Sequence, residues 1–294
     1  MAKRTAVIDL GSNSMRMAIF ERTSRWAFFI LGEYKMRVRL GEGGYDSSNE
    51  ISEKSMQKAY EALAEFKNIA KSYKCTKILC VGTSALRDAP NSTEFISMIR
   101  KKLGIGIRVI DGKAEATYGA IAAKNLLCPL DEGVTIDIGG GSTELARISG
   151  GKIVDTVSLD VGTVRVKELF FDSKNTAKLP NFLAQITAKI PANFKCQNLI
   201  AIGGSLRAIS GSIMSGSGYP LATLHGFCYK LSEQKNFIQS IADSSVLELN
   251  KFPIKKDRYD TIREGAHIFL AMSAALEAKN IYTSGVGVRE GVFL

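Results

Sequence analysis

The sequence predicts an α/β protein made of two successive units with similar layouts. Three patterns point to this fold class. An apolar strand, a glycine turn and a second strand open the chain at 5–20, and the same design returns at 134–149. Each opening is followed by segments of helical period that alternate with short buried strands. The repetition indicates an internal duplication of layout without an obvious repeat of sequence.

The first unit begins with strand-like runs. Residues 5–10 form a short apolar run rich in β-branched side chains, residues 15–20 form a second apolar run, and a Gly-Ser-Asn turn separates them. Further strand-like runs at 26–31 and 36–40 follow. Because short connections join antiparallel neighbours, we expect an antiparallel meander that starts with a tight hairpin.

Helices then alternate with strands. Residues 52–73 carry one apolar stripe at helical spacing, with Ser52 as a plausible N-cap. Another helix is expected from Asn91 or Ser92 to Leu103, stopped by Gly104. The remaining predicted elements of this unit are strands at 77–82 and 107–110 and a helix at 113–126.

A Pro-Leu-Asp-Glu-Gly stretch at 129–133 indicates a boundary, after which the pattern restarts. We therefore predict domains at 1–126 and 127–294, with the last helix as a candidate to pack back on the first domain. The predicted elements of the second domain are strands at 134–138, 143–149, 152–158 and 198–202, helices at 163–171 and 179–190, and a Gly- and Ser-rich loop at 211–223.

Composition limits the possible partners. Apolar residues make up 45% of the chain and charged residues 23%, which is typical of a globular protein. Lys and Arg outnumber Asp and Glu by 39 to 29, a formal net charge of +10 that favours anionic partners. A basic, solvated surface explains the charge equally well. The basic residues are dispersed and form no recognised module, so we expect no nucleic-acid binding.

The cysteines and the start of the sequence favour a cytoplasmic protein. The five cysteines, including Cys128, are odd in number, scattered and without a C-x-x-C pair, so we expect reduced core thiols. The strand at 5–10 leaves no room for a signal peptide, and no apolar run is long enough to span a membrane.

Two glycine loops carry the strongest functional signal. Asp9 ends a strand and leads into Gly-Ser-Asn-Ser, and Asp137 ends another and leads into three adjacent glycines. Glycine lets backbone N–H groups approach an anion, and the carboxylate suits a hydrated Mg²⁺ that bridges to phosphate oxygens. Loops in matching positions of two α/β units are expected to face each other across a cleft that holds a phosphate chain.

Further anion-binding and acidic groups follow other strands. The Ile202–Ser205 turn opens a helix, which is either a helix-N-terminus anion site or an ordinary turn. Thr83–Arg87 places small polar residues and an arginine after a strand, either for phosphate capture or as a capped turn. Glu115 lies in a helix's first turn, where a carboxylate either activates a water or simply favours the helix dipole.

Taken together, these motifs resemble the exopolyphosphatase / guanosine pentaphosphate phosphatase family. The matching segments cover nearly the whole chain: IDLGSNS (8–14), TSALRDAPN (83–91), IDGKAEA (110–116), DIGGGSTE (137–144) and REGV (289–292). The resemblance implies two ribonuclease H-like domains of the actin, sugar kinase and chaperone ATPase superfamily around a cleft.

The resemblance also implies roles for individual residues. Glu115 looks like the carboxylate that activates water, and Asp137 and Glu144 look like the acidic residues around the metal and the nucleophilic water. Asp9 would help to hold Mg²⁺, and a monovalent cation is a further candidate cofactor. Residues implied to line the phosphate path are Ser12, Asn13, Arg87, Gly139, Gly140, Gly141 and Ser142, with Arg16 and Arg289 as additional candidates.

This chain departs from the family pattern at two points. Ala114 stands at the first position of the glutamate pair that many members carry, and Glu115 at the second. The chain also ends just after the REGV motif, like the short two-domain form, so long polymers are less expected than short polyphosphate or guanosine pentaphosphate. The family further implies a role in the stringent response and a homodimer.

The predicted activity is release of terminal orthophosphate by Mg²⁺-assisted, in-line attack of water. Two alternatives remain open at this point: a non-catalytic sensor of alarmone or polyphosphate, and a nucleotide-dependent kinase of the same superfamily. His225 is interpreted as structural or interface-forming, and His267 as a core histidine on an apolar helix face.

Overall fold

A computed structural model describes residues 3–24, 27–45, 49–127, 130–220 and 222–294. The chain forms two compact units, 1–115 with 288–294 and 116–287. The domain boundary predicted at 126/127 follows helix α4 (Gly112–Leu126), whereas the contacts of the structure place most of that helix in the second unit. Cys128 and part of the predicted boundary segment 129–133 lie outside the described residues.

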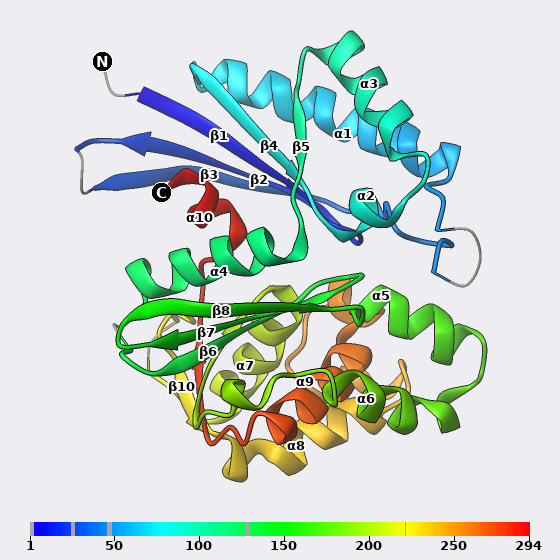
Figure 1. The fold of residues 1–294 in the computed structure, drawn as a ribbon, viewed down its shortest axis with the longest axis vertical. Coiled ribbons are helices and arrows are strands. Elements are labelled where there is room, and N and C mark those ends of the chain that lie inside the picture. The colour runs from blue at the N-terminus through cyan, green and yellow to red at the C-terminus, as the bar shows by residue number, and fades with distance from the viewer. Residues whose placement is uncertain (1–2, 25–26, 46–48, 128–129, 221) are drawn as a thin grey trace. The chain divides into compact units, whose positions relative to one another are not determined.

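The first unit is a five-stranded sheet with helices on both faces. Its strands run in the order β3-β2-β1-β4-β5, with β2 antiparallel and β4 parallel to β1. Helices α1 and α3 cover one face, and α10 packs on the other (Figure 1). Its elements are β1 (Lys3–Leu10), β2 (Met15–Arg22), β3 (Phe28–Met36), α1 (Glu53–Ser72), β4 (Lys77–Gly82), α2 (Ser84–Asp88), α3 (Ser92–Leu103), β5 (Ile107–Val109) and α10 (Val288–Phe293).

Alternation along the strands explains the two packed faces. Ile8, Leu10 and Ile19 point into the core under α1 and α3, while Val7 and Phe20 point to α10. Phe20 stacks on Phe293 of α10 with ring centroids 4.4 Å apart. The end of the sequence is therefore held against β1 and β2 by an aromatic contact.

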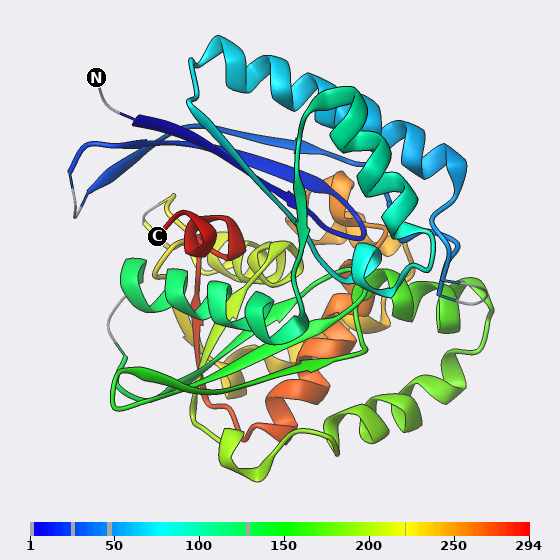
Figure 2. The ribbon, with the colours of Figure 1, turned by 45° about the horizontal axis from the view of Figure 1, so that its top comes forward.

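Capping residues in the sequence determine where the helices of this unit begin and end. The Ser52 hydroxyl accepts a hydrogen bond from the Ser55 amide at 3.2 Å, so Ser52 is the N-cap of α1, as predicted. Gly104 ends α3 in the left-handed conformation, with φ of 66°. Helices α1 and α3 lie side by side across the sheet (Figure 2).

The second unit repeats this arrangement with one strand more. Its order is β10-β11-β9-β6-β7-β8, with β7 antiparallel and β9 parallel to β6. Its strands are β6 (Gly133–Ile138), β7 (Thr143–Ser149), β8 (Lys152–Leu159), β9 (Asn198–Ile202), β10 (Cys228–Lys230) and β11 (Asn280–Thr283). The same core order in both units confirms the predicted duplication and the predicted α/β fold class of two ribonuclease H-like units.

Helix α4 covers one face of this second sheet, and α7 and α9 lie on the other (Figure 1). The α-helices are α5 (Thr163–Val166), α6 (Leu179–Thr187), α7 (Gly204–Gly216), α8 (Leu231–Asp243) and α9 (Ile262–Ala275). After α5 the chain continues as a π-helix, Lys167–Asp172, and 3₁₀ turns lie at Thr176–Lys178, Ala192–Phe194, Glu248–Lys251 and Lys256–Arg258.

Several local predictions need correction. One strand, Phe28–Met36, replaces the separate strands predicted at 26–31 and 36–40; Trp26 lies outside the described residues. The predicted loop at 211–223 is wrong over 211–216, which continues α7, because Ile213 is buried in the core. Among the described cysteines only Cys80 is buried and Cys228 is exposed, so the prediction of core thiols fails for Cys228. Across the described residues, no helix combines the length and the apolar character that crossing a bilayer requires.

Glu264, in the first turn of α9, is an unusual core residue. It is completely buried, and neither of its carboxylate oxygens has a hydrogen-bond partner among the residues that the structure describes. The nearest guanidinium nitrogen, Nη2 of Arg263, lies 3.6 Å from Oε1. Burial raises the pKa of Glu264 to about 7, because the charged form loses its hydration.

We expect Glu264→Gln to change how stability depends on pH. The pKa of Glu264 in the folded protein, about 7, lies above its ordinary value of 4.5, so the folded state binds the proton more tightly. The wild type should therefore lose stability as pH rises from about 4.5 to 7, by roughly 3 kcal/mol, and the variant should not. Denaturant unfolding at pH 5 and pH 8 measures the difference. Parallel profiles of stability against pH for wild type and variant would contradict the raised pKa of Glu264. Glu277→Gln, at an exposed site of the same unit, serves as the control.

Candidate active site

The glycine loop of the first unit is Gly11–Ser14, between β1 and β2. The amides of Arg39 and Gly41 donate to the carbonyls of Asn13 and Ser12, at 2.9 and 3.0 Å. Because a trans peptide holds its N–H opposite its C=O, the amides of Asn13 and Ser14 point away from this support. Such successive amides form a concavity that suits an anion.

Ser12 supports this loop from within. Its side chain is 2% exposed, and its hydroxyl oxygen lies 2.8 Å from that of Ser84 and accepts a hydrogen bond from Tyr45 at 3.0 Å. In this structure, Ser12 therefore joins the loop to the start of α2. The next residue, Asn13, which is also predicted to line the phosphate path, is half-buried.

The glycine loop of the second unit is Gly139–Ser142, between β6 and β7. The carbonyls of its three glycines are engaged by the start of α5: Gly139 accepts from Thr163 N at 3.0 Å, Gly140 from Val164 N at 2.8 Å and Arg165 N at 3.1 Å, and Gly141 from Arg165 Nε at 2.8 Å. By the same peptide geometry, the amides of Gly140, Gly141 and Ser142 point away from α5. Three adjacent amides with this orientation are suited to phosphoryl oxygens.

Gly162 makes the close support of that loop possible. A Cβ atom at this position would lie 2.5 Å from the backbone of Gly140 and Gly141, which no side chain tolerates. Gly41 has the matching place in the first unit, where a Cβ would lie 3.1 Å from Cβ of Ser12. Neither residue was among the predicted site residues, because each lies about 20 or more positions beyond the loop that it supports.

The carboxylates of Asp137 and Glu144 lie on one face of the second sheet. The two residues are directly opposite in the β6–β7 ladder, so their side chains point the same way. Glu144 is 2% exposed, and its Oε1 accepts a hydrogen bond from Ser158 at 2.8 Å. Sequence reasoning missed Ser158, which orients this carboxylate. Mg²⁺ is often held by one or two carboxylates together with waters and substrate phosphates, so this donor set fits the ion.

The first unit carries a different pair at the matching position. Asp9 lies opposite Arg16 in the β1–β2 ladder, as Asp137 lies opposite Glu144. The two equivalent loops are therefore flanked by different charges, one acid and one base in the first unit and two acids in the second. Within the described residues, no group of three or more His, Cys, Asp or Glu side chains gathers as a ready-made metal site.

The third predicted turn begins α7. Gly203 has φ of 91° and ψ of 170°, a backbone conformation that essentially only glycine adopts. A Cβ there would overlap Oδ1 of Asp137, so this carboxylate lies directly against the turn. Helix α7 has 13 residues, and its N-terminus carries partial positive charge beside Asp137.

Glu115 and Arg87 form an ion pair in the first unit. Nη1 of Arg87 donates to Oε2 of Glu115 at 3.1 Å and to the carbonyl of Ile110 at 3.2 Å. Asp111 caps α4 by accepting from the Ala114 amide at 2.7 Å, which fixes the first turn that carries Glu115. The structure thus brings together the predicted water-activating carboxylate and one predicted phosphate-binding arginine.

Arg289 lies beside acidic side chains, and His225 contacts backbone groups. Arg289, on α10, is 6% exposed, and its Nη2 lies 2.9 Å from Glu33 and 3.8 Å from Glu290. His225 lies 2.6 Å through Nε2 from the Leu126 carbonyl, and its Nδ1 accepts from the Gly285 amide at 3.0 Å. Both ring nitrogens of His225 are occupied by backbone, which favours its interpretation as structural.

The chain matches the family model described as the Ppx/GppA phosphatase family over residues 17–294. Among solved structures, it is similar to the Ppx/GppA family member of Aquifex aeolicus, with 25% identity and a TM-score of 0.81 over 100% of this chain and 97% of that one. An exopolyphosphatase from Cytophaga hutchinsonii has the same fold, with 22% identity and a TM-score of 0.89 over 99% and 96% of the two chains. The chain therefore belongs to the Ppx/GppA phosphatase family.

Proposed function

We propose that this phosphatase releases terminal orthophosphate from inorganic polyphosphate or guanosine pentaphosphate, with Mg²⁺ as cofactor. The observation that supports it most is the Gly139–Ser142 loop. The carbonyls of its three glycines accept hydrogen bonds from the start of α5, and the amides of Gly140, Gly141 and Ser142 point the other way. The carboxylates of Asp137 and Glu144 flank the loop. Amides and a metal-binding acid pair in one place suit a polyanionic phosphate better than an uncharged substrate.

Asp137 and Glu144 are the residues that we propose to hold Mg²⁺, with Asp9 as a further ligand. The hydrogen bond from Ser158 to Glu144 and the contact of Asp137 with Gly203 orient both carboxylates, as the surroundings of metal ligands commonly do. When bound, Mg²⁺ neutralises charge on phosphoryl oxygens.

The protein's own groups are proposed to do the remaining chemistry. The amides of the two glycine loops bind phosphoryl oxygens, and Asn13, Ser142, Arg16 and Arg289 are additional contacts. Glu115 orients a water and accepts its proton as the oxygen attacks the terminal phosphorus. Arg87, which pairs with Glu115 in the structure, offers further N–H donors to the phosphate.

A phosphate-release assay tests the proposal. Purified protein is incubated with short polyphosphate, long polyphosphate and guanosine pentaphosphate, each with Mg²⁺ and with excess chelator. We expect orthophosphate from at least one substrate with Mg²⁺, and a loss of at least about 100-fold when the ion is removed. The ratio of rates between short and long polyphosphate reports the preferred chain length.

Two outcomes would replace the proposal. Tight binding of guanosine penta- or tetraphosphate without turnover would indicate a sensor. Phosphoryl transfer from ATP to a member of a sugar panel, without hydrolysis of the three substrates, would indicate a kinase. The homodimer and the monovalent cation stay predictions, which light scattering and activity in K⁺ against Na⁺ check.

A further inference from the structure

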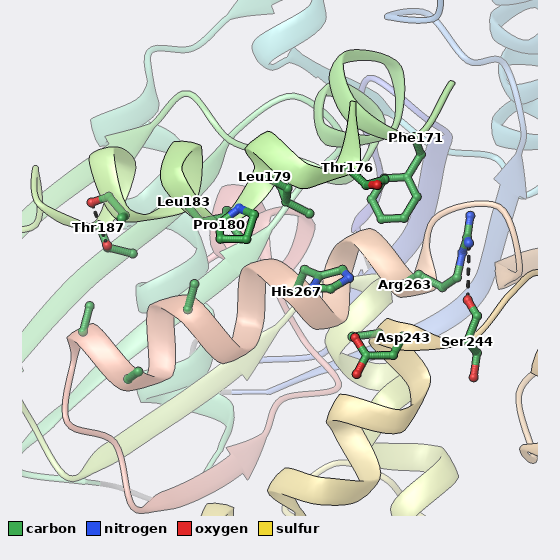
Figure 3. Close-up of a pocket in the computed structure, with 15 residues that line it drawn as sticks. Phe171, Thr176, Leu179, Pro180, Leu183, Thr187, Asp243, Ser244, Arg263 and His267 are labelled. Atoms are coloured by element: carbon green, nitrogen blue, oxygen red, sulfur yellow. Dashed lines mark hydrogen bonds between the residues drawn. The ribbon is translucent and has the colours of Figure 1, made fainter. Parts of the chain in front are cut away.

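The second unit contains a groove whose lining residues include none of those proposed above for phosphate chemistry. It has a volume of about 770 Å³ and lies between α6 and α9, closed at one end by the last residues of α8. In Figure 3, Leu179 and Leu183 on α6 face α9 across the groove. Ala271 and Ala275 on α9 are small, so they leave this space open. Volume and apolar lining are in the range of small-molecule sites.

The polar end of the groove is built around Arg263. Only 17% of its side chain is exposed, and its guanidinium lies 4.8 Å from the ring centre of Phe171. Within the described part of the chain, its Nη1 makes one long hydrogen bond, 3.3 Å to the Ser244 carbonyl, and its buried Nε has no hydrogen-bond partner. Arginine satisfies its N–H donors most readily with a carboxylate or another oxyanion.

The acids near Arg263 do not provide that partner. Glu264 lies 3.6 Å from the guanidinium, beyond hydrogen-bond distance. Asp243 turns back on its own helix, where both of its oxygens accept from Nε2 of Gln239, at 2.9 and 3.0 Å. His267 lines the groove beside Arg263, and burial lowers its pKa, so its ring is neutral near pH 7.

We propose that this groove binds an amphipathic monoanion, a medium-chain aliphatic carboxylate, with its headgroup on Arg263 and its chain along the apolar walls. The guanidinium supplies two parallel donors for a carboxylate. From Arg263 to Ala275 the groove follows α9 for roughly 18 Å, which suits an extended chain. Phe171 and His267 pack beside the headgroup, and Leu179, Leu183, Ala271 and Ala275 contact the chain.

Calorimetric titration of the full chain with decanoate tests the site. We expect saturable binding of one molecule per chain, weakened about fourfold for each methylene removed in a series down to hexanoate. Nonyl glucoside, which has the same alkyl tail as decanoate without the charge, should bind at least about tenfold more weakly. Equal binding of both amphiphiles, or binding without saturation, would overturn the proposal.

Variants separate the groove from general surface attraction. Arg263→Gln should weaken decanoate binding by about tenfold or more, and Ala271→Trp should abolish it by filling the groove. Lys178→Gln, an exposed cation next to α6, should leave it unchanged. Arg263→Gln also removes the charge beside Glu264, so a loss of binding in that variant has two explanations. Ala271→Trp tests the groove independently of that charge. If a folded Ala271→Trp protein binds decanoate as the wild type does, the groove is not the site.

Discussion

Glu115→Gln is expected to leave the fold intact and to reduce phosphate release by about 100- to 10,000-fold, the usual cost of removing one activating carboxylate. Gln keeps the shape of the side chain and one oxygen, so Arg87 retains a hydrogen-bond acceptor at the position it now contacts. The cap from Asp111 does not involve the side chain of Glu115, so α4 should start at the same residue. What Gln cannot do is accept a proton from water.

Steady-state rates on the best of the three substrates measure this effect. We expect the loss in kcat, with KM changed much less, because a group that acts on the water contributes mainly in the transition state. Glu94→Gln is the matched control, since Glu94 is also a first-turn helix glutamate but is exposed. Near-wild-type kcat in a folded Glu115→Gln protein would remove Glu115 from the catalytic role and leave the family assignment untouched.

The sequence was sufficient to predict the glycine loops and their duplication. In both units an Asp is the second-last residue of the first strand, and the loop brings the residue seven positions later directly opposite it. This spacing follows from a short antiparallel connection, so the pairs Asp9–Arg16 and Asp137–Glu144 are local features. The predicted antiparallel meander is also local, because short connections join β1 to β2 and β2 to β3.

The supports of those loops depend on contacts between distant segments, and the sequence did not reveal them. Gly41 and Gly162 look like ordinary loop glycines in the sequence. In the structure, the loop backbone of Gly140 and Gly141 lies against Gly162, and the side chains of Ser12 and Tyr45 lie against Gly41. In the segment 211–216, the sequence predicts the wrong local structure. Its Gly and Ser content predicts a loop, yet Ile213 packs into the core and extends α7. In that segment tertiary packing overrides local propensity.

Gly203→Ala is expected to damage the proposed Mg²⁺ site at Asp137. At φ of 91° and ψ of 170° an alanine costs about 1 to 3 kcal/mol of backbone strain. Its Cβ would also overlap Oδ1 of Asp137, so either the carboxylate or the start of α7 must move. Because disturbing the surroundings of a metal ligand commonly costs 10- to 100-fold in affinity, we expect the Mg²⁺ concentration for half-maximal activity to rise by about tenfold or more.

Gly211→Ala, in the same helix, provides the matched control. A Cβ at Gly211 meets no atom of the described residues within 4 Å, so alanine should be neutral or stabilise the helix by about 0.5 to 1 kcal/mol. Magnesium titrations of activity for the two variants, with denaturant unfolding alongside, separate loss of the site from loss of the fold. A Gly203→Ala protein that is destabilised yet keeps the wild-type Mg²⁺ dependence would show that Asp137 does not hold the ion. Unchanged stability would instead mean that the turn adapts to a side chain. A rise in the Mg²⁺ requirement restricted to Gly203→Ala would tie this turn, through Asp137, to the metal.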